Sequence, residues 1–263
     1  MNIRTAERNT PQLWDRFWKS TPRATDASRE LEEWEKSVRW QRIATFISQT
    51  FGDFRGLKAI EVGCGKGALS ALMAKRGADV TLLDSSERAL TTAEKYYTAN
   101  GLRARFVLSD ALTPPPEFSG SFDICSSVGL SEHFLGDARL RINRVHFDLV
   151  RPGGLVINAV PNSACPPYRI YKLLAETIGV WRVGEEFPYS RREFQGICRE
   201  LGVTEYTFIG ESFYRSLRLL NPLRVFARFR TGAAATGKPI RLERGTPLDS
   251  YVSYSLVLCA KKP

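Results

Sequence analysis

Alternating glycines follow a short apolar segment near residue 60 and could form a ligand-binding turn. Residues 59–67 read AIEVGCGKG, and the glycines are Gly63, Gly65 and Gly67. Glycine lets the backbone turn sharply and approach a ligand closely, and a following helix points its unpaired N–H groups into the same space. Glu61 lies two positions before the first glycine, where a carboxylate adds little for a pyrophosphate but attracts a cation. The pattern predicts a cradle for a positively charged small molecule.

Two further acidic residues follow strand-like segments. Residues 79–84 read as a buried strand that ends in Asp84. Its distance along the chain from Gly63 is close to the roughly 20 residues at which a carboxylate meets ribose hydroxyls in nucleotide-binding βαβ units. Residues 105–108 lead in the same way to Asp110. Because open α/β sheets bind ligands at the carboxyl ends of their strands, we expect these carboxylates to lie beside the glycine turn.

In their order along the chain, these motifs resemble those of the class I S-adenosylmethionine-dependent methyltransferases of the small-molecule type. The match extends from about residue 57 to 162 and includes SFDI at 121–124 and LVRPGGL at 149–155. The resemblance implies S-adenosylmethionine as the cofactor. It also implies a Rossmann-like, doubly wound α/β sheet of seven strands with the last antiparallel, and the expected N-terminal helices resemble the lids of this family. The family usually joins its last two strands by a short hairpin, so the residues at 211–245 are expected to form an additional helical insertion before the last strand.

The same resemblance assigns roles to particular residues. It implies that the glycine turn holds the methionine end of the cofactor, that Asp84 binds the ribose hydroxyls and that Asp110 reads the adenine edge with the Ala111 amide. Ser127 would face the methionine moiety. The implied cofactor-binding set is Glu61, Gly63, Cys64, Gly65, Gly67, Asp84, Ser85, Asp110, Ala111 and Ser127. Taken singly, each of these residues could instead belong to an ordinary tight turn or a helix cap.

Other functions stay open at this point. The glycines also fit a permissive dinucleotide fingerprint, and Tyr168 and Lys172 have the Tyr-x-x-x-Lys spacing of short-chain dehydrogenases, so an NAD(P)-dependent oxidoreductase is one alternative. An RNA methyltransferase and a non-catalytic adaptor at a membrane are two others. A non-catalytic adaptor does not require glycines and carboxylates that face a ligand, so the presence of both argues against this alternative.

Glu132 and His133 are the only adjacent acid and imidazole that follow the expected fourth strand. If the acceptor is a hydroxyl, His133 can take its proton near neutral pH, with Glu132 orienting the ring or meeting the substrate. Alternatively, the pair begins the next helix and is structural. The pair resembles that of ubiquinone-pathway O-methyltransferases, in which a glutamate three residues earlier helps to bind a divalent metal. Gly129 stands at that position here, so no metal site is expected.

Two insertions are expected around the acceptor side of the fold. Residues 163–190 contain aromatic residues that would contact the acceptor or anchor the loop, with Tyr168, Tyr171 and Trp181 as the predicted substrate contacts. Residues 211–245 carry eight basic and two acidic residues, which is +6 of the net charge of +10. Between 213 and 230 arginines alternate with large apolar residues, as in basic amphipathic helices that contact an anionic membrane or RNA, or that pack on the fold.

Length and composition predict one enzyme domain with appendages. We divide residues 1–263 into an N-terminal helical cap (1–52), a cofactor-binding core (53–162), an acceptor-side insertion (163–190) and a basic insertion (211–250). Five widely spaced cysteines without a Cys-x-x-Cys pair indicate a reducing compartment. No apolar run has the length of a signal peptide or a membrane span, so we expect a cytoplasmic protein, peripheral at the membrane if the basic insertion binds lipid.

Overall fold

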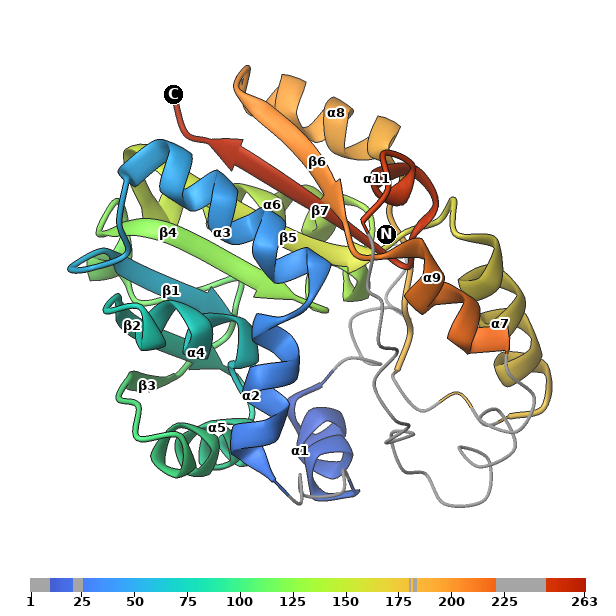
Figure 1. Ribbon diagram of the computed structural model, residues 1–263, viewed down its shortest axis with the longest axis horizontal. Coiled ribbons are helices and arrows are strands. Elements are labelled where there is room, and N and C mark those ends of the chain that lie inside the picture. The colour runs from blue at the N-terminus through green and yellow to red at the C-terminus, as the bar shows by residue number, and fades with distance from the viewer. Residues whose placement is uncertain (1–9, 21–25, 180, 182–183, 221–244) are drawn as a thin grey trace.

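The computed structural model describes residues 10–20, 26–179, 181, 184–220 and 245–263 (Figure 1). Seven strands form one sheet in the order β3-β2-β1-β4-β5-β7-β6. The strands are β1 (Lys58–Val62), β2 (Asp79–Asp84), β3 (Arg105–Leu108), β4 (Phe122–Val128), β5 (Val150–Pro161), β6 (Tyr206–Gly210) and β7 (Ser255–Lys261). The first five pair in parallel, and β7 runs antiparallel to both β5 and β6. The predicted seven-stranded sheet with an antiparallel last strand is confirmed.

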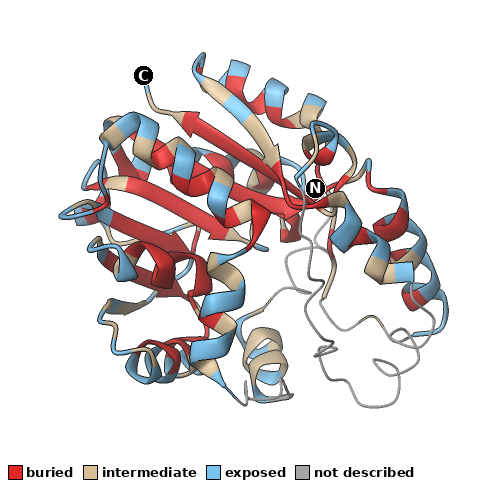
Figure 2. Cartoon of the chain, viewed as in Figure 1, coloured by how far each residue is buried: buried red, intermediate tan, exposed pale blue. Residues whose placement is uncertain are grey.

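Helices cover both faces of the sheet. They are α1 (Pro11–Ser20), α2 (Ala27–Glu35), α3 (Val38–Phe51), α4 (Ala68–Lys75), α5 (Glu87–Ala99), α6 (Asp137–Leu149), α7 (Pro166–Thr177), α8 (Arg191–Glu200), α9 (Phe213–Ser216) and α11 (Asp249–Val252). Three 3₁₀ turns are η1 (Pro116–Phe118), η2 (Ser131–His133) and η3 (Leu217–Leu220). Figure 2 shows the inner strands buried along most of their length and the edge strand β6 mostly intermediate or exposed, with buried and exposed residues alternating along the surface helices.

Two apolar layers enclose the sheet, because successive strand residues point to opposite faces. On one face, Leu82 and Ile157 pack with buried residues of α3, α4 and α5. On the other face, Leu83 and Val156 pack with buried residues of α6 and α8. Parallel strands buried on both faces read as continuous apolar runs, which is why β1, β2 and β5 were recognisable in the sequence.

Two element boundaries differ from the expectation. The apolar periodicity over 31–51 indicates a single helix, but the structure has α2 and α3 with a break at Ser37. The Ser37 hydroxyl donates to the carbonyl of Trp34 and accepts from the backbone N–H of Trp40, so it caps α3 as α2 ends. The sequence at 251–259 predicts a last strand that starts at residue 251, but β7 begins at Ser255, because α11 precedes it.

Asp249 anchors both stems of the excursion between β6 and β7. Its buried carboxylate accepts hydrogen bonds from the backbone N–H groups of Phe213 (3.0 Å) and Thr246 (2.7 Å). It also lies 2.9 Å from the guanidinium of Arg42 on α3, which donates to the Gly210 carbonyl. The Asp249 carboxylate therefore connects Phe213 and Thr246, which are 33 positions apart in the sequence, to Arg42 on α3.

Replacing Asp249 with Ala should lower the free energy of unfolding by about 3 kcal/mol or more, because it leaves two backbone donors without their acceptor and removes the ion pair with Arg42. Urea unfolding measures this loss. The matched control is Asp79→Ala, which removes an exposed carboxylate and should change stability by about 0.5 kcal/mol at most. Equal effects of the two variants would contradict the anchoring role.

Candidate functional site

The glycine turn lies where β1 ends and α4 begins. Gly63, Gly65 and Gly67 all have positive φ angles, of 62°, 53° and 70°. A Cβ on Gly67 would come within 2.8 Å of Leu82, and one on Gly65 within 2.5 Å of the Trp18 ring. Both conformation and space thus require glycine here. The turn leads directly into the N-terminus of α4, which is the arrangement expected for a ligand cradle.

Asp84 connects this turn to the next helix. Its carboxylate accepts hydrogen bonds from the backbone N–H groups of Gly65 (2.9 Å) and Ser86 (2.9 Å). Burial raises the pKa of Asp84, and these N–H groups oppose the rise. A carboxylate has about four acceptor positions, so Asp84 can hold the turn and still accept from hydroxyl groups of a ligand.

Glu61 is buried beneath the turn. Its Oε2 accepts a hydrogen bond from the backbone N–H of Ser70 at 3.1 Å, in the first turn of α4, where Gly67 offers no capping side chain. Burial raises the pKa of Glu61 to about 7. A cation bound nearby would favour the ionised form. The residues therefore fit a cofactor with a positive charge at its methionine end and hydroxyl groups on its ribose.

Helix α1 lies over the cradle and against α5 (Figure 1). The Trp18 ring covers Gly65, and the Trp14 ring makes an edge contact with His133 at a centroid distance of 4.7 Å. Asp15 accepts a hydrogen bond from the Ser86 hydroxyl at the start of α5. The sequence indicated an aromatic N-terminal cap but not Asp15, because a single acid in a helix carries no pattern.

The remaining predicted cofactor residues divide into two groups. Asp110 is exposed after β3 and accepts from the N–H of Leu112 at 2.7 Å, beside buried Ala111, while Ser85 is half-buried after Asp84. Two others are turned inward: Cys64, whose thiol pKa is raised by burial, and Ser127. The Ser127 hydroxyl lies 2.8 Å from Nε2 of His146 and 3.2 Å from Oδ1 of Asn158.

Glu132 and His133 lie in η2, on the same side of the sheet as the cradle. Nδ1 of His133 is 2.7 Å from the Glu185 carbonyl, which can only accept, so Nδ1 carries the proton and Nε2 is the basic nitrogen. Burial lowers the pKa of His133 to about 4. Glu132 is buried, and its Oε2 has no hydrogen-bond partner among the described residues. Burial, with Glu186 nearby, raises the pKa of Glu132.

Of the aromatic residues predicted as substrate contacts, Tyr168 bonds to a carboxyl group close to this pair, whereas Tyr171 and Trp181 contact each other. Tyr168 is buried, and its hydroxyl donates to Glu186, whose pKa is raised by burial. Tyr171 and Trp181 are half-buried and contact each other, with ring centroids 6.1 Å apart. Their roles as substrate contacts stay predictions. Within the described residues, no group of three His, Cys, Asp or Glu side chains could hold a metal ion.

Comparison with known proteins agrees with this geometry. A family model described as a methyltransferase domain matches residues 59–154. The ubiquinone biosynthesis O-methyltransferase of Caulobacter sp. strain K31 is 32% identical over 146 residues, which are 55% of this chain and 57% of that protein. The chain thus spans little more than half the length of that curated relative.

Solved structures resemble the whole described fold. A magnesium protoporphyrin IX methyltransferase from Synechocystis PCC 6803 with bound SAH has a TM-score of 0.56 at 15% identity, covering 96% of this chain and 93% of the other. The chain has a class I methyltransferase fold. The resemblance inferred from the glycine turn and the strand-end carboxylates is confirmed. A protein whose structure concerns conversion of a disulfide bond into a thioacetal group in echinomycin biosynthesis matches with a TM-score of 0.61 at 16% identity, covering 97% of this chain and 92% of that chain.

In this methyltransferase fold, Glu61 makes stability depend on pH. The native carboxyl keeps a proton that the unfolded chain releases above pH 4.5, so stability falls as pH rises from 4.5 to about 7. The side chain introduced by Glu61→Gln cannot ionise. The free energy of unfolding of this variant should therefore be roughly 3 kcal/mol higher than that of the wild type at about pH 8, with no such gain at about pH 4. Urea unfolding at both pH values measures the difference.

The control for this prediction is Glu94→Gln, which neutralises an exposed carboxylate on α5. It should leave the pH dependence unchanged. If Glu61→Gln and Glu94→Gln unfold alike at both pH values, Glu61 is not a buried acid with a raised pKa.

Proposed function

We propose that this protein is an S-adenosylmethionine-dependent methyltransferase that methylates a hydroxyl group of a small-molecule acceptor. The observation that carries the proposal is the presence of a neutral, oriented imidazole, that of His133, on the same side of the sheet as a cofactor-type cradle. The named O-methyltransferases among its relatives support the choice of oxygen.

The cradle residues would hold the cofactor by complementary charge and hydrogen bonding. Asp84 would accept from the ribose hydroxyls, and Glu61 would favour the cationic methionine end. When bound, S-adenosylmethionine supplies a methyl group on a positively charged sulfur. The protein contributes alignment, exclusion of water and a base.

His133 would act as that base. The Glu185 carbonyl fixes its tautomer, so Nε2 can take the proton of the acceptor hydroxyl as the oxygen becomes nucleophilic. Because the pKa of His133 is lowered to about 4, the imidazole stays neutral through the physiological pH range. The acid limb of activity should therefore lie well below the usual histidine value.

The acceptor we propose is lipid-like, and the protein would meet it at an anionic membrane surface. Two adjoining segments, α7 with its C-cap residue and α9–η3, are shown in Figure 1. They carry most of the exposed large apolar side chains of the described residues. These residues are Ile170, Leu173, Leu174, Ile178, Tyr214, Leu217 and Leu220. Arg169 and Arg215 are exposed on the same segments. Aliphatic and basic side chains together fit an anionic lipid surface better than RNA, which favours stacking aromatics.

The basic insertion bears on the same proposal only in part. Residues 213–220 form α9 and η3, while residues 221–244 lie outside the described residues. None of the described helices has the length and apolarity to cross a bilayer. Contact would therefore be made by surface side chains of these segments.

Replacing His133 with Gln tests the activity. Transfer of a labelled methyl group to hydroxylated aromatic lipids should fall by about 100-fold or more in kcat, while calorimetric binding of S-adenosylhomocysteine stays unchanged. In the wild type, the acid limb of kcat should lie near pH 4 to 5 rather than above pH 6. Unchanged turnover of His133→Gln on an accepted substrate would remove the base role.

Liposome co-sedimentation tests membrane contact. The wild type should bind vesicles that contain anionic phosphatidylglycerol, and binding should weaken at high salt. The variant Leu173→Gln/Leu174→Gln/Ile178→Gln should lose most of this binding because it removes the aliphatic face of α7. The control is Leu108→Gln, at a similarly exposed apolar residue at the end of β3. Absence of wild-type binding would refute the surface.

A further inference from the structure

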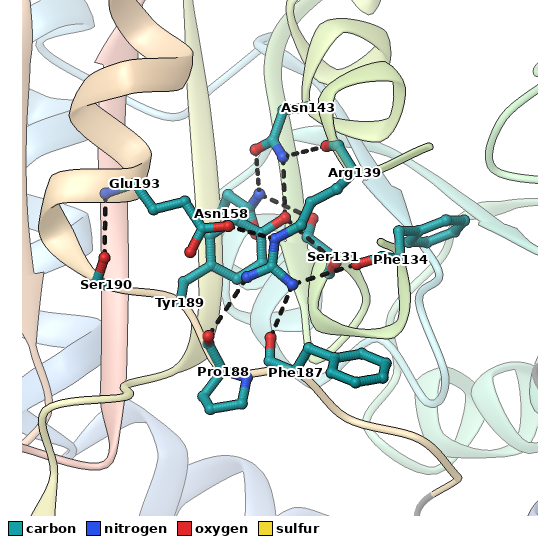
Figure 3. Close-up of polar contacts among 10 residues, drawn as sticks. All are labelled: Ser131, Phe134, Arg139, Asn143, Asn158, Phe187, Pro188, Tyr189, Ser190 and Glu193. Atoms are coloured by element: carbon teal, nitrogen blue, oxygen red, sulfur yellow. Dashed lines mark hydrogen bonds and ion pairs between the residues drawn. The ribbon is translucent and has the colours of Figure 1, made fainter. Parts of the chain in front are cut away.

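A buried arginine, Arg139 on α6, joins the two backbone segments that hold the proposed base (Figure 3). Its Nη1 donates to the carbonyls of Phe134 (3.2 Å) and Phe187 (2.9 Å), and its Nη2 donates to the carbonyl of Pro188 (3.4 Å). Phe134 ends the η2 turn, and the other two belong to the segment before α8. A buried arginine needs partners for its charged donors, and Arg139 directs three hydrogen bonds to backbone carbonyls of these two segments.

The same two segments hold His133 directly. The Glu185 carbonyl accepts from Nδ1 of His133, and the Phe187 N–H donates to the Glu132 carbonyl at 2.8 Å. Arg139 thus hydrogen-bonds to residues that are next to those that orient the imidazole. A shift of either segment would move the ring or admit water to it.

The guanidinium itself is fixed from two further sides. It stacks on the Tyr189 ring, with its central carbon 3.5 Å from the ring centroid, and its Nε lies 2.6 Å from the Glu193 carboxylate on α8. The Tyr189 hydroxyl donates to the Ser131 carbonyl at 3.2 Å. A planar, always charged guanidinium can make this set of contacts, whereas a lysine ammonium cannot.

Buried amides extend the arrangement to the sheet. The Asn143 amide donates to the Arg139 carbonyl and to the Tyr189 hydroxyl, and the Asn158 amide on β5 donates to Asn143 Oδ1 and to the Ser131 hydroxyl (Figure 3). These bonds secure the start of η2 to a central strand. A buried hydrogen-bond network of this kind rigidifies the loop that it supports.

We infer that Arg139 is a positioning residue that keeps the His133 imidazole buried and aligned by fastening the η2 turn to residues 185–188. This inference rests on the proposed base role of His133 for its catalytic meaning, but its structural content does not. The guanidinium does not itself contact His133. It acts through the backbone carbonyls on either side of it.

The test requires that the charged groups around His133 are the same in the variant and in the wild type. Burial lowers the pKa of His133, and Lys172 on α7 lowers it further. Glu132 precedes it in η2, Glu185 and Glu186 lie in the fastened segment, and Asp15 lies on α1 beside Trp14. Arg139→Lys changes none of these groups and keeps its own positive charge, so a change at His133 would report geometry.

The test is a histidine titration by NMR, which needs no methyl transfer. The chain has only two histidines, so ¹³Cε1-labelled protein gives two imidazole signals, assigned with the His133→Gln variant. In the wild type, the His133 signal should not titrate above about pH 5. In Arg139→Lys, its midpoint should move upward by about one pH unit or more, because water reaches the ring. Turnover should fall about tenfold or more in kcat with an unchanged KM for the cofactor.

Two controls keep the outcome decisive. Arg141→Lys makes the same change at an exposed position of the same helix and should titrate as the wild type. If Arg139→Lys does not fold, Glu193→Gln removes only the ion pair and should move the His133 midpoint in the same direction by less. A folded Arg139→Lys variant whose His133 midpoint equals that of the wild type would overturn the inference. If only Glu193→Gln folds, an unchanged His133 midpoint in that variant would overturn it as well.

Discussion

The site depends on one carboxylate that bonds two backbone segments at once. Asp84 accepts from Gly65 in the glycine turn and from Ser86 at the start of α5, so the ends of β1 and β2 are held in one geometry. The cost is a buried charge whose pKa is raised. Because the turn needs glycines to reach this carboxylate, backbone conformation and ligand chemistry are set by the same few residues.

The acceptor side is organised by a different constraint, the satisfaction of backbone carbonyls. Residues 185–188 contact the η2 turn and lie outside the strands of the sheet, and their backbone groups are paired by His133, Arg139 and the Glu132 carbonyl. The base role that we propose for His133 would need such support, because loops are otherwise variable in position. The electrostatic result is a neutral imidazole beside buried carboxyl groups.

Sequence patterns predicted the features that repeat or lie at fixed intervals. Strands β1, β2 and β5 were visible as apolar runs, and Asp84 followed from its interval to Gly63. Arg139 and Asp15 were missed, because their partners lie 48 and 71 residues away and no local pattern marks them. The inward turn of Ser127 depends on strand parity, and the helix break at Ser37 depends on a single cap, so both needed coordinates.

Above all, the cradle must bind a nucleoside with a positively charged sulfur. Isothermal titration of the full chain with S-adenosylmethionine, S-adenosylhomocysteine and NADH tests this most directly. We predict one site for each adenosyl ligand, no heat with NADH, and weaker binding of S-adenosylmethionine by Glu61→Gln. Binding of NADH, with no heat from either adenosyl ligand, would contradict the assignment.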